Sequence, residues 1–364
     1  MKVLYICGTY APGAFAGSEL SAHELMVMLN NESSASALVV TDEKYTGGMP
    51  GKIELDGVPV LGVSHDRRKQ AIREIIETFG PDVILTQLMW SDVAVQCGKQ
   101  LNIPTVLRIP SMAGNLDIES PTALVANSRF VCDWAHKKSG RTCHFITSVI
   151  NLERVVAPKS LRRPRYITMF NPLRNKGGHI FREISKAMPA TEFAFVPGWH
   201  SLKNADGTWN KKVIDAGLES QGATHFGWTP EEVDLSGLDN VKELEPRDSV
   251  ADIFAETRIL LVPSQYKETL ARVSIEAMAN GIPVLGSEVG GLQDHVRKAG
   301  VLVKDYANPL AWVREIERLD DPNIYAHFCE KGLKYIREEF SNEETFNKFM
   351  SLFEDLVRTH NVSD

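Results

Sequence analysis

Short apolar runs typical of buried strands alternate with segments of helical periodicity along most of this chain. In the first half the runs are residues 2–7, 37–40, 81–85, 105–109 and 123–126, and helical spacing is found around 20–29, 69–79, 93–99 and after Ser128. A strand covered on both faces is hydrophobic throughout, whereas a half-exposed strand alternates. The pattern therefore predicts a parallel sheet with helices on both sides.

The alternation stops at a polar segment with two prolines, residues 152–164, and then starts again. Strands are predicted at 166–170, 192–196, 258–262 and 282–286, helices at 179–186 and 270–279, and a helical stretch from about 308 to 359. We expect two Rossmann-like α/β domains, residues 1–155 and 156–340. We further expect residues 341–364 to form a helix that can pack back on the first domain. Ligands of such sheets bind beyond the carboxyl ends of the strands, so two facing domains would enclose a cleft.

Composition limits the class of protein. Lys and Arg number 40 against 47 Asp and Glu, a net charge of −7, so binding to nucleic acid through bulk charge gains no support. Five scattered cysteines without CxxC pairs argue against a disulfide framework and a zinc site, and no metal ligands are expected. No stretch approaches the roughly 18 apolar residues of a membrane-spanning helix. These features indicate a soluble cytoplasmic protein, with peripheral contact with a membrane left open.

The most informative segment runs from Pro263 to His295 and carries two glutamates, Glu268 and Glu276. Glu268 is placed in a loop after a strand. Glu276 is expected two helical turns further on among apolar residues, where a carboxylate needs a partner such as a ribose diol. Two plainer interpretations stay open. Glu268 could be a first-turn carboxylate that interacts favourably with the helix dipole, and Glu276 could form an i, i+4 ion pair with Arg272.

The start of the helix in this segment is a second candidate feature. Thr269 can cap the helix, and the first free backbone N–H groups, near Thr269, Leu270 and Ala271, would then form an anion site suited to a diphosphate. After the next predicted strand, the pair Gly290-Gly291 would let the backbone approach a ligand closely.

Glu268, seven intervening residues, Glu276 and the following AMANGIPVLGSEVGG resemble the signature of glycosyltransferase family 4, the retaining group 1 glycosyltransferases of the GT-B architecture. The resemblance is compatible with the whole chain. It implies a metal-independent transfer from a nucleoside-diphosphate sugar, a UDP- or GDP-sugar, to a hydroxyl acceptor, with no separate cofactor. By that similarity Glu268 would contact hydroxyls of the donor sugar and act in catalysis, and Glu276 would hold the nucleotide ribose.

A loop of sequence FNPLRNKGG, residues 170–178, follows the first strand of the second domain and precedes a helix. Lys176 would face the donor diphosphate and ease the negative charge that grows on it as the glycosidic bond breaks. The family pattern has an Arg five residues before this lysine, where Asn171 stands here. Arg174 is the candidate for the missing second charge, and a plain surface turn is the alternative interpretation.

The acceptor side of the sequence is less defined. The loop Gly8–Glu19 resembles the Gly-rich loop of the family, and Gly17 would allow backbone N–H groups to approach a phosphate or the acceptor. Family members often carry a His after the fourth strand. None stands here, so Arg108, Ser111 and His23 are the candidates on the acceptor side. The acceptor is left open between a glycan, a lipid-linked glycan, a small molecule and a modified base.

Three alternatives to a retaining transferase are kept. A nucleotide-sugar epimerase and an inverting transferase could share this architecture, and the inverting enzyme would need a base, for which Glu19, His23 and Asp92 are the candidates. A catalytically idle nucleotide-sugar-binding protein is the third. His295, after the glycine pair, is as compatible with packing as with function.

Overall fold

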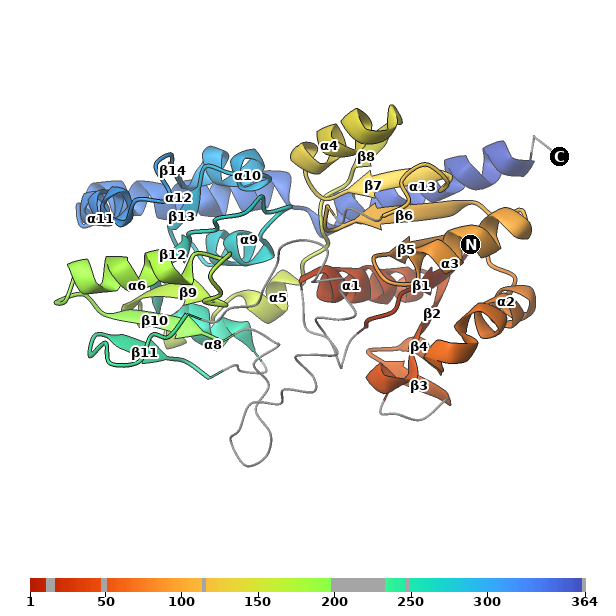
Figure 1. Ribbon diagram of the computed structural model, residues 1–364, viewed down its shortest axis with the longest axis horizontal. Helices are drawn as coiled ribbons and strands as arrows, with labels where there is room; N and C mark the ends of the chain where they lie inside the picture. Colours follow the sequence, from red (N-terminus) through yellow and green to blue (C-terminus); the bar gives the residue numbers. More distant parts are fainter. Residues whose placement is uncertain (11–16, 47–50, 113–115, 198–232, 246–248, 362–364) are drawn as a thin grey trace. The chain divides into compact units, whose positions relative to one another are not determined.

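The structure is a computed structural model that describes residues 1–10, 17–46, 51–112, 116–197, 233–245 and 249–361. The chain divides into two compact units (Figure 1). Unit 1 comprises residues 1–150 and 342–364, and unit 2 comprises residues 151–341. The division after Ile150 falls a few residues ahead of the predicted boundary at 155–156, because Asn151 already caps a short helix of unit 2, α5 (Leu152–Val155).

Unit 1 is built on an eight-stranded sheet in the order β3-β4-β2-β1-β5-β6-β7-β8. Neighbouring strands are parallel except for the antiparallel hairpin of β3 and β4. The strands are β1 (Lys2–Ile6), β2 (Ser36–Asp42), β3 (Gly51–Leu55), β4 (Val58–Val63), β5 (Val83–Gln87), β6 (Thr105–Ile109), β7 (Ala123–Ala126) and β8 (Cys143–Phe145).

Helices cover both faces of this sheet, which is why its central strands are continuously apolar. Successive side chains of β1 enter different cores: Leu4 packs with residues of α2 and α3, whereas Tyr5 packs with residues of α1 and α13. The helices are α1 (Gly17–Asn31), α2 (Arg68–Phe79), α3 (Ser91–Gln100), α4 (Arg129–Ser139) and α13 (Asn342–Asn361), with 3-10 turns η1 (Glu43–Thr46) and η2 (His65–Arg67). The last helix thus contributes Phe349 and Phe353 to the core of unit 1.

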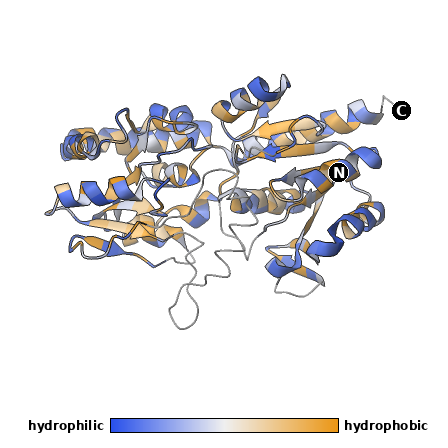
Figure 2. Cartoon of the chain, viewed as in Figure 1, coloured by the Kyte–Doolittle hydropathy of each residue, from blue (hydrophilic) through white to orange (hydrophobic). Residues whose placement is uncertain are grey.

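Unit 2 has a six-stranded parallel sheet in the order β11-β10-β9-β12-β13-β14. Its strands are β9 (Tyr166–Phe170), β10 (Phe193–Val196), β11 (Val241–Glu243), β12 (Thr257–Val262), β13 (Val284–Ser287) and β14 (Val301–Val303). Besides α5 and the 3-10 turn η3 (Lys159–Leu161), its helices are α6 (Gly178–Ala187), α8 (Val250–Glu256), α9 (Arg272–Ala279), α10 (Leu292–Ala299), α11 (Pro309–Arg318) and α12 (Pro322–Glu339). In Figure 2 the strands are coloured mainly as hydrophobic, and the helices carry hydrophilic residues as well.

The prediction of two Rossmann-like α/β units is confirmed. In each sheet the strand order reverses direction once: β1 lies between β2 and β5 in unit 1, and β9 lies between β10 and β12 in unit 2. This reversal is called a switch point, because the loops on its two sides leave in opposite directions. Ligands of doubly wound sheets bind there, beyond the carboxyl ends of the strands. The loops after β9 and β12 therefore mark the place in unit 2 where function is expected.

None of the helices in the described residues is long and apolar enough to cross a membrane.

Candidate active site in unit 2

The loops after β9 and β12 bring two predicted site residues together. Lys176 comes from the first loop and Glu268 from the second, and the Lys176 ammonium donates a hydrogen bond of 2.8 Å to Oε1 of Glu268. The Glu268 side chain is 6% exposed and that of Lys176 is 26% exposed. A buried carboxylate thus has its counter-ion beside it, while the lysine keeps some access to solvent.

Two further side chains of the β12 loop complete the contacts of Glu268. The Ser264 hydroxyl donates to Oε1 at 2.7 Å, and the Tyr266 hydroxyl donates to Oε2 at 2.8 Å. Tyr266 also accepts a hydrogen bond from Lys176 at 2.5 Å, and the ammonium nitrogen lies 4.9 Å from the centre of its ring. Sequence reasoning missed Ser264 and Tyr266, because a serine and a tyrosine in a polar loop carry no periodic or spacing signal.

This network shifts the pKa values of its members. Burial by itself lowers the pKa of Lys176, but the negative charge of Glu268 and the hydrogen bonds to Glu268 and Tyr266 outweigh burial and raise it. Burial by itself raises the pKa of Glu268, and the Lys176 charge together with three donated hydrogen bonds brings it below its ordinary value. Burial and the Glu268 charge raise the pKa of Tyr266. Near neutral pH the site holds an ammonium, a carboxylate and a neutral phenol.

Glycines allow the loops to pack this closely. Gly177 has a φ of +88°, and a Cβ there would lie 1.9 Å from the Pro263 carbonyl oxygen. Gly290 has a φ of +57°, and a Cβ there would lie 2.4 Å from the Glu268 carbonyl oxygen. Gly291 N–H donates to that same oxygen at 2.7 Å. The glycine pair 290–291, predicted to admit a ligand, thus packs against the backbone of Glu268 and fixes the loop that bears this carboxylate.

Glu276 lies in α9 with its side chain 10% exposed, and its Oε1 accepts a hydrogen bond of 2.6 Å from Nε of Arg272. The i, i+4 ion pair kept open from the sequence is therefore present. Both side chains are largely buried, so each charge needs the other in the absence of a ligand.

The start of α9 differs from the prediction. The residue at the N-cap is Ala271, in the left-handed region at φ +58° and without a side-chain cap, and the helix begins at Arg272. The prediction that Thr269 caps the helix is wrong, and Thr269, Leu270 and Ala271 belong to the preceding loop. The chain bends sharply at Ala271, three residues after the Glu268 carbonyl that accepts a hydrogen bond from Gly291 N–H.

Asn171 and Arg174, the other predicted residues of the loop after β9, differ in burial and in their hydrogen bonds. Asn171 adopts a φ of +57°, which Asn tolerates better than most residues, and its N–H donates to the Val196 carbonyl at 2.7 Å. Its buried Oδ1 has no hydrogen-bond partner among the described residues. The side chain of Arg174 is exposed, and its carbonyl accepts from Gly177 N–H at 3.0 Å.

His295 occupies a packing position beside this site. It is 2% exposed, its Nδ1 is 3.0 Å from the Gly291 carbonyl and its Nε2 is 2.6 Å from the Ser274 hydroxyl. A carbonyl only accepts, so Nδ1 carries the proton. Burial lowers the pKa of His295 to about 4, so the imidazole is neutral at pH 7.

The candidates in unit 1 are held by internal contacts. His23 is 4% exposed, with Nδ1 2.8 Å from the Tyr10 hydroxyl and Nε2 3.0 Å from Asp56. Glu19 is 2% exposed and accepts from Thr9 at 2.8 Å and from Ser18 at 2.5 Å.

Four more predicted residues lie in the same unit. Arg108 in β6 is 6% exposed and donates to Gln87 at 3.0 Å and to Ser21 at 3.2 Å. Ser111 and Asp92 are exposed, and so is Gly17, the first residue of α1. Residues 11–16 of the predicted Gly-rich loop lie outside the described residues.

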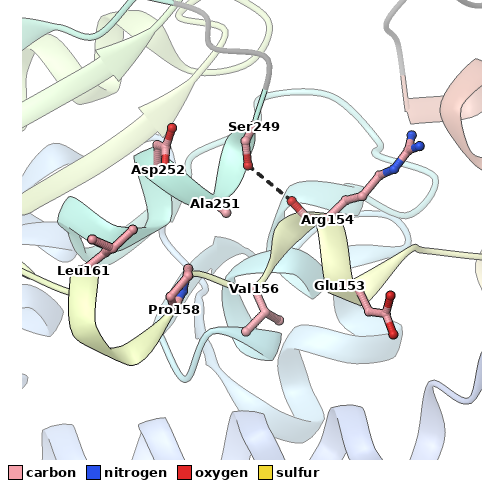
Figure 3. A pocket seen from close by; sticks show the side chains of 8 residues that line it. All are labelled: Glu153, Arg154, Val156, Pro158, Leu161, Ser249, Ala251 and Asp252. Atoms are coloured by element: carbon pink, nitrogen blue, oxygen red, sulfur yellow. Dashed lines mark hydrogen bonds between the residues drawn. The ribbon is translucent and has the colours of Figure 1, made fainter.

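Two hollows in unit 2 lie apart from this network. One, of about 480 Å³, is lined by Glu153, Arg154, Val156, Pro158, Leu161, Ser249, Ala251 and Asp252. Figure 3 shows Glu153 and Arg154 pointing away from its other lining residues. The second, of about 440 Å³, begins at Pro172 in the lysine loop and extends along β10 and β11. None of the predicted site residues lines either hollow.

Comparison with known proteins identifies relatives of this chain. Residues 217–321 match the family model of glycosyl transferases group 1. The D-inositol 3-phosphate glycosyltransferase of Salinispora tropica is 32% identical over 130 residues, which cover 35% of this chain and 27% of that protein. The N-acetyl-alpha-D-glucosaminyl L-malate synthase of Bacillus anthracis is 27% identical over 122 residues, 33% of this chain and 32% of that protein. The matched stretches thus span about a third or less of these curated relatives.

Solved structures match over nearly the whole chain. Sucrose-phosphate synthase from Thermosynechococcus elongatus superposes with a TM-score of 0.76 and 17% identity, covering 99% of this chain and 100% of the other. The Anabaena protein HepE in complex with UDP-glucose superposes with a TM-score of 0.74 and 16% identity, covering 98% and 100%. At these identities the likeness shows the fold. Residues 217–321 are therefore similar to group 1 glycosyl transferases, and the chain as a whole has the two-unit GT-B fold.

Proposed function

We propose that this protein is a metal-independent retaining glycosyltransferase that moves a sugar from a nucleoside-diphosphate sugar to a hydroxyl acceptor. The observation that carries the proposal is the pair of Lys176 and Glu268, joined at 2.8 Å where the strand order of unit 2 reverses. A cation and a buried carboxylate at such a point suit a ligand that has both phosphate oxygens and hydroxyl groups.

In the proposed reaction the bond between the anomeric carbon and the diphosphate breaks, and the acceptor oxygen bonds to that carbon from the same face. Lys176 stabilises the negative charge that accumulates on the leaving diphosphate. Glu268 accepts hydrogen bonds from hydroxyls of the transferred sugar, and Glu276 receives the ribose diol. The leaving diphosphate accepts the proton of the acceptor hydroxyl, so no protein base is required for that step.

Retention is favoured because two of the three side chains weighed as an inverting base are engaged in internal hydrogen bonds. Glu19 accepts hydrogen bonds from Thr9 and Ser18, and His23 is held between Tyr10 and Asp56. Of the three candidates weighed from the sequence, Asp92 is the exposed one, at the first turn of α3. The anomeric configuration of the product, read by NMR from the coupling of its anomeric proton, tests this part of the proposal. An inverted product would contradict it.

The donor is proposed to be a UDP- or GDP-sugar. Support comes from HepE, a structural neighbour that was solved with UDP, with UDP and glucose, and with UDP-glucose. A thermal-shift screen of nucleotide sugars would identify the donor, because a ligand at 100 times its dissociation constant adds about 2.7 kcal/mol of stability. The acceptor is proposed to be a glycan, a lipid-linked glycan, a small molecule or a modified base.

The decisive experiment incubates the protein with labelled nucleotide sugars, with and without EDTA. Slow hydrolysis or transfer that survives EDTA is expected from the wild type. Glu268→Gln, which keeps the shape and removes the charge of the carboxylate, should bind the nucleotide with little change and lose most turnover. Formation of an epimer would indicate the epimerase, and binding without any turnover would indicate an idle binding protein.

A further inference from the structure

Tyr266 contacts both charged groups of the candidate site through one hydroxyl. That oxygen lies 2.5 Å from the Lys176 nitrogen and 2.8 Å from Oε2 of Glu268. Ser264, the other neutral partner, donates to Glu268 alone. Among the described residues, Tyr266 is therefore the neutral side chain that couples the position of the cation to that of the carboxylate.

The direction of each hydrogen bond follows from the chemistry of the groups. An ammonium only donates and a carboxylate only accepts. The phenol must therefore accept from Lys176 and give its own proton to Glu268. Lys176, Tyr266 and Glu268 form a closed ring of three hydrogen bonds in which each donor and acceptor is fixed.

This ring also determines what Lys176 has left for a ligand. Two of its three N–H donors go to Tyr266 and Glu268, and the face of the Tyr266 ring lies beside the ammonium at 4.9 Å. A lysine side chain has high rotational freedom, which these contacts restrict. One donor is left with a fixed direction.

We infer that Tyr266 is a positioning residue that aims the remaining N–H of Lys176 at the departing diphosphate while holding Glu268 in place for the sugar. The inference rests on the proposed function for its effect on turnover. Its effect on the state of Lys176 does not depend on that function, because the ring consists of hydrogen bonds within the protein.

The kinetic test is Tyr266→Phe, which keeps the ring and removes the hydroxyl. Loss of the two hydrogen bonds that the hydroxyl makes to charged groups should lower kcat about tenfold to a hundredfold, with KM for the nucleotide sugar little changed, because the Lys176–Glu268 pair persists. Tyr335→Phe, in α12 with its ring 5.5 Å from that of Phe340, is the matched control and should keep wild-type kinetics. An unchanged kcat in Tyr266→Phe would overturn the inference.

A second readout separates positioning from a merely structural role. The Cε signal of Lys176, followed by NMR against pH in the ligand-free protein, should titrate at lower pH in Tyr266→Phe, since an acceptor of the ammonium is lost. Ser264→Ala removes a donor to Glu268 that does not touch Lys176, so it should move the Glu268 carboxyl signal and leave the Lys176 titration closer to that of the wild type.

The outcomes are distinguishable. A wild type that turns over no nucleotide sugar would refute the proposed function, and the Lys176 titration would still test Tyr266. Equal Lys176 titrations in wild type and Tyr266→Phe would overturn the positioning role, whatever the activity.

Discussion

Replacing Gly290 with alanine should displace Glu268, because Gly290 packs against the backbone of that residue. Gly290 has a φ of +57°, and an added Cβ would lie 2.4 Å from the Glu268 carbonyl oxygen and 2.8 Å from its nitrogen. A real Cβ does not come closer than 3.0 Å to such atoms, so the two backbones would have to separate by about 0.6 Å. The left-handed conformation costs alanine about 1 kcal/mol, and weakening the Gly291 to Glu268 hydrogen bond costs about 1 kcal/mol more.

Gly237→Ala is the matched control for this experiment. It lies in the same unit at φ +74°, and a Cβ there meets no described atom within 4 Å. Its free energy of unfolding in urea should fall by about 1 kcal/mol, the cost of the left-handed conformation alone. For Gly290→Ala the free energy of unfolding should fall by about 2 kcal/mol or more.

The activity of the two variants should differ more than their stability. Because a misplacement of about 1 Å at a reacting group can cost about a hundredfold in rate, Gly290→Ala should lose at least tenfold in kcat while Gly237→Ala keeps its kcat. If both variants unfold at the same urea concentration and both stay active, the packing of glycines 290–291 does not fix Glu268, and the reasoning is refuted.

The remaining predictions concern three other positions. Glu276→Ala should weaken binding of a nucleoside diphosphate about tenfold by calorimetry and destabilise unit 2 by about 1–3 kcal/mol, because Arg272 is left buried without its carboxylate. Unchanged affinity would remove Glu276 from the donor site. Burial lowers the pKa of His295 to about 4, so on acidification the unfolded chain takes up this proton before the folded protein does. The contribution of His295 to the free energy of unfolding should therefore be full above about pH 6.5 and fall toward pH 4 by at most about 3 kcal/mol. His295→Gln should flatten that pH dependence. Phe353 is fully buried in α13, so Phe353→Ala should lower the free energy of unfolding of unit 1 by about 3–5 kcal/mol. Phe145 is 39% exposed, so Phe145→Ala should lower it far less. Equal urea midpoints for the two variants would contradict the packing of α13 in unit 1.

The sequence predicts the central strands well because they are buried on both faces. Residues 105–109 and 123–126, for example, were expected as strands and form β6 and β7 with the same bounds. The hairpin of β3 and β4 was not predicted, since β3 is largely exposed and its sequence GKIEL has no apolar run. Strand β11 has three residues, too few for a periodic signal.

Only the site residues that lie in loops directly after strands were predictable from the sequence. Lys176 and Glu268 follow the two strands that flank the switch point, and that rule placed both at the same edge of the sheet. The role of Tyr266 and the bend at Ala271 depend on how the loops pack on one another, which local propensity does not encode. Thr269 had the residue type of a helix cap, yet the N-cap position is Ala271 and α9 starts at Arg272.

The division of the chain into units has a consequence for its synthesis. Unit 2 is one continuous segment, so all of it is synthesised before α13. Unit 1 needs Phe349 and Phe353 from that last helix to fill the space beside Tyr5. Although its strands are translated first, unit 1 cannot finish folding until α13 has been made. A stop codon near residue 341 would leave unit 2 complete and the core of unit 1 without Phe349 and Phe353.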